Sequence, residues 1–135
     1  MSSSSSPSPD SSSLVTDARR LAESSYDRAV EDMSHGELDA AIAGFRASLA
    51  ADPGFSDANH GLIHALKSAG RFDEAIAVTQ ALIAANPDDT LAHTSLSILY
   101  QHKGKIPEAE AAGLRAKVLG WKQQLREQTR AEDGQ

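Results

Sequence analysis

The chain has 135 residues, a hydrophobic content of 40%, an aromatic content of only 4% and a formal net charge of −6. This length suits one domain with a modest core, which Ala, Leu and Ile have to fill. The sequence has no Cys, which excludes disulfides, thiolate metal sites and a Cys nucleophile. Residues 1–89 carry six Lys and Arg against fourteen Asp and Glu, so −8, whereas residues 90–135 carry seven against five, so +2. A net acidic chain is not expected to bind nucleic acid.

The first thirteen residues, MSSSSSPSPDSSS, are nearly all Ser and Pro. Such a segment buries too little surface to offset its ordering entropy, so residues 1–13 are predicted to be a disordered tail. Ser6 and Ser8 each precede Pro and would allow phosphorylation, but no other feature supports that role. The segment lacks the basic and apolar regions of a secretory signal, and no apolar run approaches the length of a membrane span. We therefore expect an intracellular, cytoplasmic protein.

Six amphipathic helices are predicted after the tail. The first is expected to begin near Leu14 and to end at Gly36, which supplies a left-handed turn at little cost. The next four are predicted over residues 38–51, about 57–68, 72–85 and 90–102, each with apolar residues at helical spacing. They end at residues that interrupt helices, namely Pro53, Gly70, Pro87 and Gly104.

The sixth helix is predicted to begin with Pro107 in its first turn and to bury Ala109, Ala112, Ala116 and Leu119. Gly113 lowers the helix propensity by about 1 kcal/mol relative to Ala, and the sequence identifies no contact that explains it. Residues 121–135 are predicted to form a capping helix with a short tail, in which Trp121 covers the end of the preceding helices. The alternative is a functional basic surface, formed by Arg115, Lys117, Lys122, Arg126 and Arg130.

An internal repeat organises the chain. The segment 36–53, GELDAAIAGFRASLAADP, recurs after 34 residues as GRFDEAIAVTQALIAANP, residues 70–87. A further 34 residues on, the register retains Gly104, Glu108, Ala109 and Ala111. A fixed period of this length is typical of proteins that stack helical repeats.

This pattern resembles the tetratricopeptide repeat family, whose repeat is a pair of antiparallel helices. The resemblance implies an all-α fold of three stacked helical hairpins, a right-handed α-solenoid with a C-terminal capping helix. The repeats would span about 22–55, 56–89 and 90–123, within a domain at 14–120 that is flanked by the tail 1–13 and the cap 121–135. It also implies a non-catalytic adaptor that binds a peptide or helix of a partner protein in a concave groove. The alternative is a permanent structural or assembly subunit of a larger complex.

In this family, the first helix of each repeat lines the groove. The residues at the corresponding positions, which we expect to contact a partner, are Tyr26, Val30, Met33, His60, His64, Lys67, Leu91, Thr94, Ile98, Gln101 and His102. Tyr26, Val30, Met33, Leu91 and Ile98 would form an apolar strip that suits an extended segment or an amphipathic helix. The alternative is that Tyr26, Val30 and Ile98 are partly covered by neighbouring helices.

Chaperone-binding members of the family hold an acidic C-terminal tail with a clamp of Lys, Asn and Arg side chains. The matching positions here carry Tyr26, Val30, Gly61, Leu91 and Ser95. None of these side chains pairs with a carboxylate by charge. Binding of that kind of tail is therefore not expected.

His60 and His64 lie one helical turn apart, a spacing that can bind a metal ion. Two ligands do not make a site, so we interpret both as groove histidines and predict no metal and no cofactor. No nucleophile, phosphate loop or paired-carboxylate motif stands out, and an enzyme is not predicted. The expected partner is a protein or peptide that the sequence does not identify.

Overall fold

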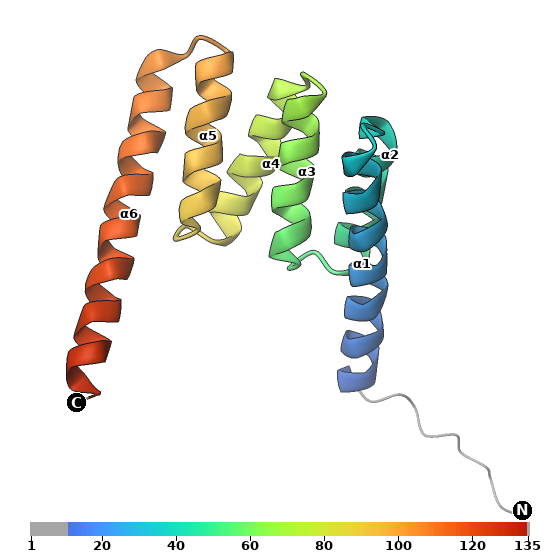
Figure 1. Ribbon diagram of the computed structural model, residues 1–135, viewed down its shortest axis with the longest axis horizontal. Coiled ribbons are helices and arrows are strands. Elements are labelled where there is room, and N and C mark those ends of the chain that lie inside the picture. Colours follow the sequence, from blue (N-terminus) through green and yellow to red (C-terminus); the bar gives the residue numbers. More distant parts are fainter. Residues whose placement is uncertain (1–10, 135) are drawn as a thin grey trace, which may run out of the picture. The chain divides into compact units, whose positions relative to one another are not determined.

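The computed structural model of the chain describes residues 11–134, which form six α-helices (Figure 1). They are α1 (Ser11–Ser34), α2 (Leu38–Ala51), α3 (Ser56–Ser68), α4 (Phe72–Ala85), α5 (Thr90–His102) and α6 (Ile106–Asp133). No strand occurs among these residues, so the all-α prediction is confirmed. Most of the predicted tail lies outside the described residues, and α1 begins three residues before the expected start at Leu14. None of the six helices is long and apolar enough to cross a membrane.

Three glycines spaced 34 residues apart form the turns between paired helices. Gly36, Gly70 and Gly104 have φ angles of 73°, 75° and 73°. Residues other than Gly rarely adopt this left-handed conformation, which explains why the repeat keeps Gly at this position. The amide after each Gly bonds back to the preceding helix: Glu37 to the Asp32 carbonyl, Arg71 to Leu66 and Lys105 to Tyr100, at 2.9, 2.9 and 2.8 Å.

The chain divides into two compact units, and the first ends at Ala65. It contains α1, α2 and most of α3. Small residues hold α1 and α2 together: Ala22, Ala29 and Ala41 are fully buried. The hydroxyl of Ser48 on α2 donates a 2.6 Å hydrogen bond to the Ala22 carbonyl of α1. The helix pair therefore packs backbone against backbone, as the Ala-rich composition predicted.

Aromatic rings connect all three helices of this unit. Tyr26 of α1 lies 5.7 Å from the Phe45 ring of α2 and 5.2 Å from the Phe55 ring just before α3, measured between centroids. Phe45 and Phe55 are almost fully buried. A side chain at Gly61 of α3 would collide with the Phe45 ring, so this Gly allows α3 to lie directly on it.

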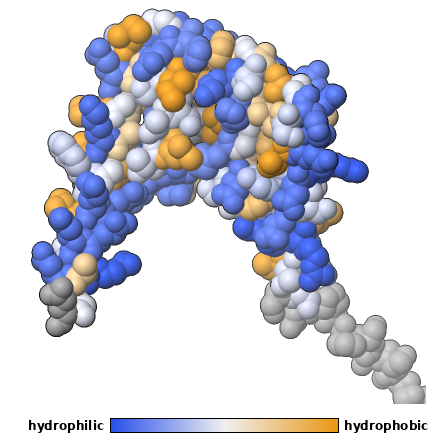
Figure 2. Space-filling model, viewed as in Figure 1, coloured by the Kyte–Doolittle hydropathy of each residue, from blue (hydrophilic) through white to orange (hydrophobic). Residues whose placement is uncertain are grey.

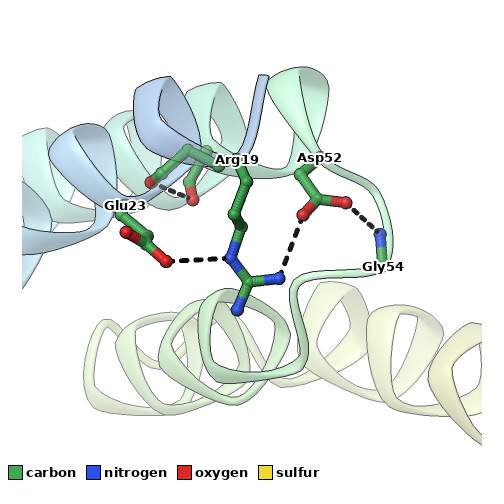
Figure 3. Close-up of polar contacts among 6 residues, drawn as sticks. Arg19, Glu23, Asp52 and Gly54 are labelled. Atoms are coloured by element: carbon green, nitrogen blue, oxygen red, sulfur yellow. Dashed lines mark hydrogen bonds and ion pairs between the residues drawn. The ribbon is translucent and has the colours of Figure 1, made fainter. Parts of the chain in front are cut away.

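Arg19 of α1 fastens the turn before α3 (Figure 3). Its guanidinium bonds to Glu23 and to Asp52, each at 3.1 Å, and lies 4.0 Å from the centroid of the Phe55 ring. Asp52 also accepts the Gly54 amide at 3.2 Å. Desolvation lowers the pKa of Arg19, but the hydrogen bonds to Asp52 and Glu23 outweigh it and raise the pKa. The side chain of Arg19 is 46% exposed, so these ion pairs position the turn more than they stabilise the fold.

The second unit runs from Leu66 through the last turn of α3, α4, α5 and α6. α5 contacts both α4 and α6. Leu82 of α4, Leu99 of α5 and Leu119 of α6 are buried between these helices together with several Ala side chains. At the edge of the α4–α5 contact, the Gln80 amide donates to the Tyr100 hydroxyl at 3.0 Å.

Gly113 has the contact partner that the sequence did not identify. A side-chain carbon at this position of α6 would lie 3.2 Å from the hydroxyl oxygen of Ser97 on α5. That hydroxyl donates a 2.7 Å hydrogen bond to the Ala109 carbonyl of α6. The lower helix propensity of Gly is thus accepted because it leaves room for a hydrogen bond between the two helices.

Residues 121–133 continue α6 without a break, and the helix extends past the end of α5 (Figure 1). Trp121 is 67% exposed and Leu125 is 61% exposed. The predicted burial of Trp121 is therefore wrong. Without Pro at position 121 the helix does not turn back, and its last three turns stay in solvent.

Candidate protein-binding surfaces

One face of α5 carries the predicted partner-binding residues of the second unit. Leu91, Thr94, Ile98, Gln101 and His102 follow each other at intervals of three or four, apart from the adjacent last pair, and so share one side of the helix. All five are exposed. Leu91 is 56% exposed and Ile98 is 36% exposed, which is unusual for two large apolar side chains on one face. This side of α5 offers apolar contacts that no residue of its own unit uses fully.

The C-terminal end of this face is held by α4. The His102 ring stacks on the Phe72 ring at 4.8 Å between centroids and an angle of 11°. The Lys103 ammonium lies 3.1 Å from the Asp73 carboxylate. At the other end of the face, the Thr94 hydroxyl donates to the Thr90 carbonyl of its own helix at 3.1 Å. His102 therefore contributes to the surface as the exposed edge of a stacked pair, a role that the sequence did not indicate.

The predicted residues of the first unit differ in their accessibility. Val30 of α1 is 43% exposed, whereas Tyr26 and Met33 are half-buried. Tyr26 packs between Phe45 and Phe55, so for this residue the alternative of coverage by neighbouring segments is correct. The accessible apolar surface of α1 at these positions is mainly that of Val30.

The remaining predicted residues lie on α3. His64 is exposed, His60 is half-buried, and Lys67, in the last turn of the helix, is half-buried. Nowhere in residues 11–134 does a group of three or more His, Asp or Glu side chains lie close enough to hold a metal ion.

A second set of exposed apolar residues lies on α6 and was not recognised as such in the sequence. Ile106, Leu114, Trp121 and Leu125 are 50%, 62%, 67% and 61% exposed. Figure 2 shows that hydrophobic surface occurs as separate spots on a largely hydrophilic face of the molecule. The available signal was the continuous spacing of these residues across position 121, where the earlier repeats have Pro.

Comparison with known proteins decides the family. A sequence model of the tetratricopeptide repeat matches residues 32–99, about half of the chain. The chain belongs to the tetratricopeptide repeat family. A search among curated protein sequences finds no match.

Solved structures with the same fold include several tetratricopeptide repeat proteins. A crystal structure of MamA is 26% identical with a TM-score of 0.73, over 82% of this chain and 64% of that one. The second repeat domain of Spaghetti (RPAP3), bound to the HSP90 peptide SRMEEVD, is 19% identical with a TM-score of 0.71, over 78% and 96%. The Yersinia enterocolitica type III secretion translocator chaperone SycD is 22% identical with a TM-score of 0.70, over 73% of each chain. This chain therefore spans just under two thirds of the MamA chain that it matches.

Proposed function

We propose that this tetratricopeptide repeat protein is a non-catalytic interaction module that binds a peptide or helix of a partner protein. The observation that carries this proposal is the α5 face, on which Leu91 and Ile98 remain exposed beside polar residues. Exposed apolar side chains one or two turns apart suit the anchor residues of an amphipathic helix or an extended segment. On α1, Val30 is the residue that would extend this recognition.

The titles of the related structures support a protein or peptide ligand. RPAP3 is described with a bound peptide and SycD as a translocator chaperone. The ligand of this chain is expected to differ from SRMEEVD in chemistry. Tyr26, Val30 and Leu91 stand at positions where chaperone-binding relatives use side chains that pair with carboxylates. We therefore propose a partner segment recognised through apolar side chains, not through an acidic tail.

The polar residues of the proposed surface would set the orientation of the bound segment. Gln101 and Thr94 on α5 and His64 on α3 are exposed and can form hydrogen bonds to a peptide backbone. Rim contacts of this kind contribute less to affinity than the anchors, because water competes for them.

The test is to select binders from a random peptide library with the full chain and to measure their affinity by fluorescence anisotropy. For the peptides selected, Leu91→Ser and Ile98→Ser are each expected to lose about 1–2 kcal/mol of binding free energy. The matched control is Leu21→Ser, since Leu21 is 61% exposed on α1 and lies opposite Val30 by helical periodicity. SRMEEVD serves as a negative control peptide.

Two results would contradict the proposal. If Leu21→Ser weakens binding as much as the α5 variants do, the loss reflects apolar surface in general. If both α5 variants bind like the parent, the working surface lies elsewhere on the chain.

A further inference from the structure

The internal repeat identifies one face on each second helix of a hairpin. On α2 this face includes Ile42 and Phe45, which are 4% and 1% exposed. The next helix in the chain, α3, covers it, with Gly61 against the Phe45 ring. On α4 the same face begins with Phe72, and α5 covers it through the stacked ring of His102. This face of a second helix is therefore a helix-binding surface.

The equivalent face of α6 is open. Its residues, displaced by one or two periods from their counterparts on α4 and α2, are Ile106, Glu110, Gly113, Lys117 and Trp121. In the part of the chain that the structure describes, no helix of the second unit lies on it. Beside Gly113 it forms an open depression, which Ser97 and Gln101 of α5 border on one side and Leu114 on the other. Ile106, Leu114 and Trp121 are each at least half exposed here.

The order of residues along this face reads the same from both ends, with the charges exchanged. Ile106 and Trp121 lie equally far from the midpoint between Gly113 and Leu114, and both are large and apolar. Glu110 and Lys117 are also equally far from that midpoint, and they carry opposite charges. Intervals of three and four residues keep all of these positions on one side of a helix.

We propose that this face binds the same face of a second copy of the chain, as an antiparallel pair of α6 helices. The two-fold axis passes between Gly113 and Leu114. Around such an axis every contact occurs twice, as in any isologous dimer. Glu110 of each copy then lies opposite Lys117 of the other, and Trp121 of each copy lies opposite Ile106 of the other.

The small residue at the centre suits this arrangement. Gly113 has no side chain, so the second helix approaches closely and Leu114 of each copy fits beside Gly113 of the other. Leu114 is 62% exposed in the single chain and is covered in the pair. The remaining turns of α6, beyond Trp121, then lie beside the second copy instead of projecting into water.

Charge favours a second copy over an unrelated helix. At the positions of Glu110 and Lys117, α2 has Ile42 and Leu49, and α4 has Ile76 and Ile83, so α6 exchanged two apolar residues for charged ones. A merely solvated helix end would accept these charges with any sign and in any order. A self-pairing face requires one acid and one base at mirrored positions, because like charges opposite each other oppose association. The sequence of α6 meets that requirement.

The experiment is sedimentation of the full chain over a wide range of protein concentration. The parent is expected to show a reversible monomer–dimer equilibrium without larger species. Glu110→Lys and Lys117→Glu each place two like-charge pairs in the dimer, and each is expected to raise its dissociation constant at least about tenfold. The double exchange Glu110→Lys with Lys117→Glu restores both pairs in reversed order, and it should return the constant to within about threefold of the parent.

Matched controls separate this face from net charge. Glu108→Lys and Arg115→Glu change the same charges at exposed positions of α6 outside the face, and they should leave the dissociation constant unchanged. Leu114→Lys places two like charges beside the axis and should abolish the dimer while far-UV circular dichroism stays that of the parent.

Three results overturn the proposal: a parent that stays monomeric at the highest concentration, species larger than a dimer, or a double exchange that does not restore association. Because Glu110, Lys117 and Leu114 are exposed, a variant that fails to associate yet melts like the parent reports on the interface and not on folding.

Discussion

At the scale of single residues, glycines inside helices decide how closely those helices pack. A side-chain carbon at Gly44 of α2 would lie 2.9 Å from the Ala29 side chain of α1. Gly61 of α3 and Gly113 of α6 have similarly close neighbours, the Phe45 ring and the Ser97 hydroxyl. Gly weakens a helix interior by about 0.5–1 kcal/mol relative to Ala, so its presence at three contact positions indicates that close approach returns more.

Gly120 provides the contrast, because it is also inside α6 but a side-chain carbon there would meet nothing within 4 Å. Gly120→Ala is expected to raise the free energy of unfolding by about 0.5–1 kcal/mol through helix propensity alone. Gly113→Ala should gain less than this or lose stability, since the new methyl group crowds the Ser97 hydroxyl. Urea denaturation of both variants measures the difference. Equal stabilisation by the two changes would mean that the Ser97 contact imposes no constraint.

Gly61→Ala is expected to destabilise the first unit by about 1–3 kcal/mol, because the added methyl group overlaps the Phe45 ring. The cost should fall clearly when Phe45→Leu removes the ring, although that change alone leaves a cavity. A double-mutant cycle from thermal or urea unfolding gives the coupling between the two sites. Strictly additive costs would show that α3 does not rest on Phe45 in solution.

At the scale of helices, the sequence predicted most of the fold because Gly and Pro punctuate it. The predicted bounds of the second, fourth and fifth helices agree with α2, α4 and α5. Gly70 and Gly104 adopt the left-handed turn that their position in the repeat implied. These ends depend on local backbone chemistry, which a single sequence displays directly.

The C-terminal helix shows where local reasoning was insufficient. Trp121 occupies the position of Pro53 and Pro87, and its size suggested a buried cap. Without a Pro or a left-handed Gly, however, the backbone has no reason to leave the helix, and Gly120 continues it. Hydrophobic character alone did not predict burial, because burial requires a neighbouring element that the chain does not supply here.

The candidate site divides in the same way. Helical periodicity was enough to place Leu91, Thr94 and Ile98 on one face of α5. It was not enough for Tyr26, whose accessibility depends on Phe55, a residue outside its helix pair. Nor did it reveal that His102 stacks on Phe72. Contacts between segments distant in the sequence require the packed structure.

The exposure of Trp121 leads to a prediction about stability. In dilute solution, where the chain is monomeric, Trp121→Ala should change the free energy of unfolding by no more than about 0.5 kcal/mol. Its fluorescence emission should be that of an indole in water and should shift little on unfolding. Leu119→Ala, two residues earlier, is the control: Leu119 is 2% exposed, and its loss should cost about 2–5 kcal/mol. A large loss with Trp121→Ala in dilute solution would mean that the chain buries this ring.

At the scale of the molecule, each of the two compact units has an interior of its own. Phe45 and Phe55 belong to the first unit, and Leu99 and Leu119 belong to the second. In repeat proteins stability is close to a sum of local terms, because each repeat contacts only its neighbours. A defect in one interior is therefore expected to open that interior first.

Hydrogen exchange measured by mass spectrometry tests this expectation with two matched variants. Phe45→Ala removes a ring that is 1% exposed in the first unit, at a cost of about 3–5 kcal/mol, and should speed exchange mainly in α1 and α2. Leu99→Ala removes a fully buried side chain in the second unit, at about 2–5 kcal/mol, and should speed exchange mainly in α5 and α6. The reciprocal pattern is the informative result, because general destabilisation by either variant would raise exchange in all helices together. If both variants accelerate every helix equally, the two interiors unfold as one cooperative structure, and a local defect has no local consequence.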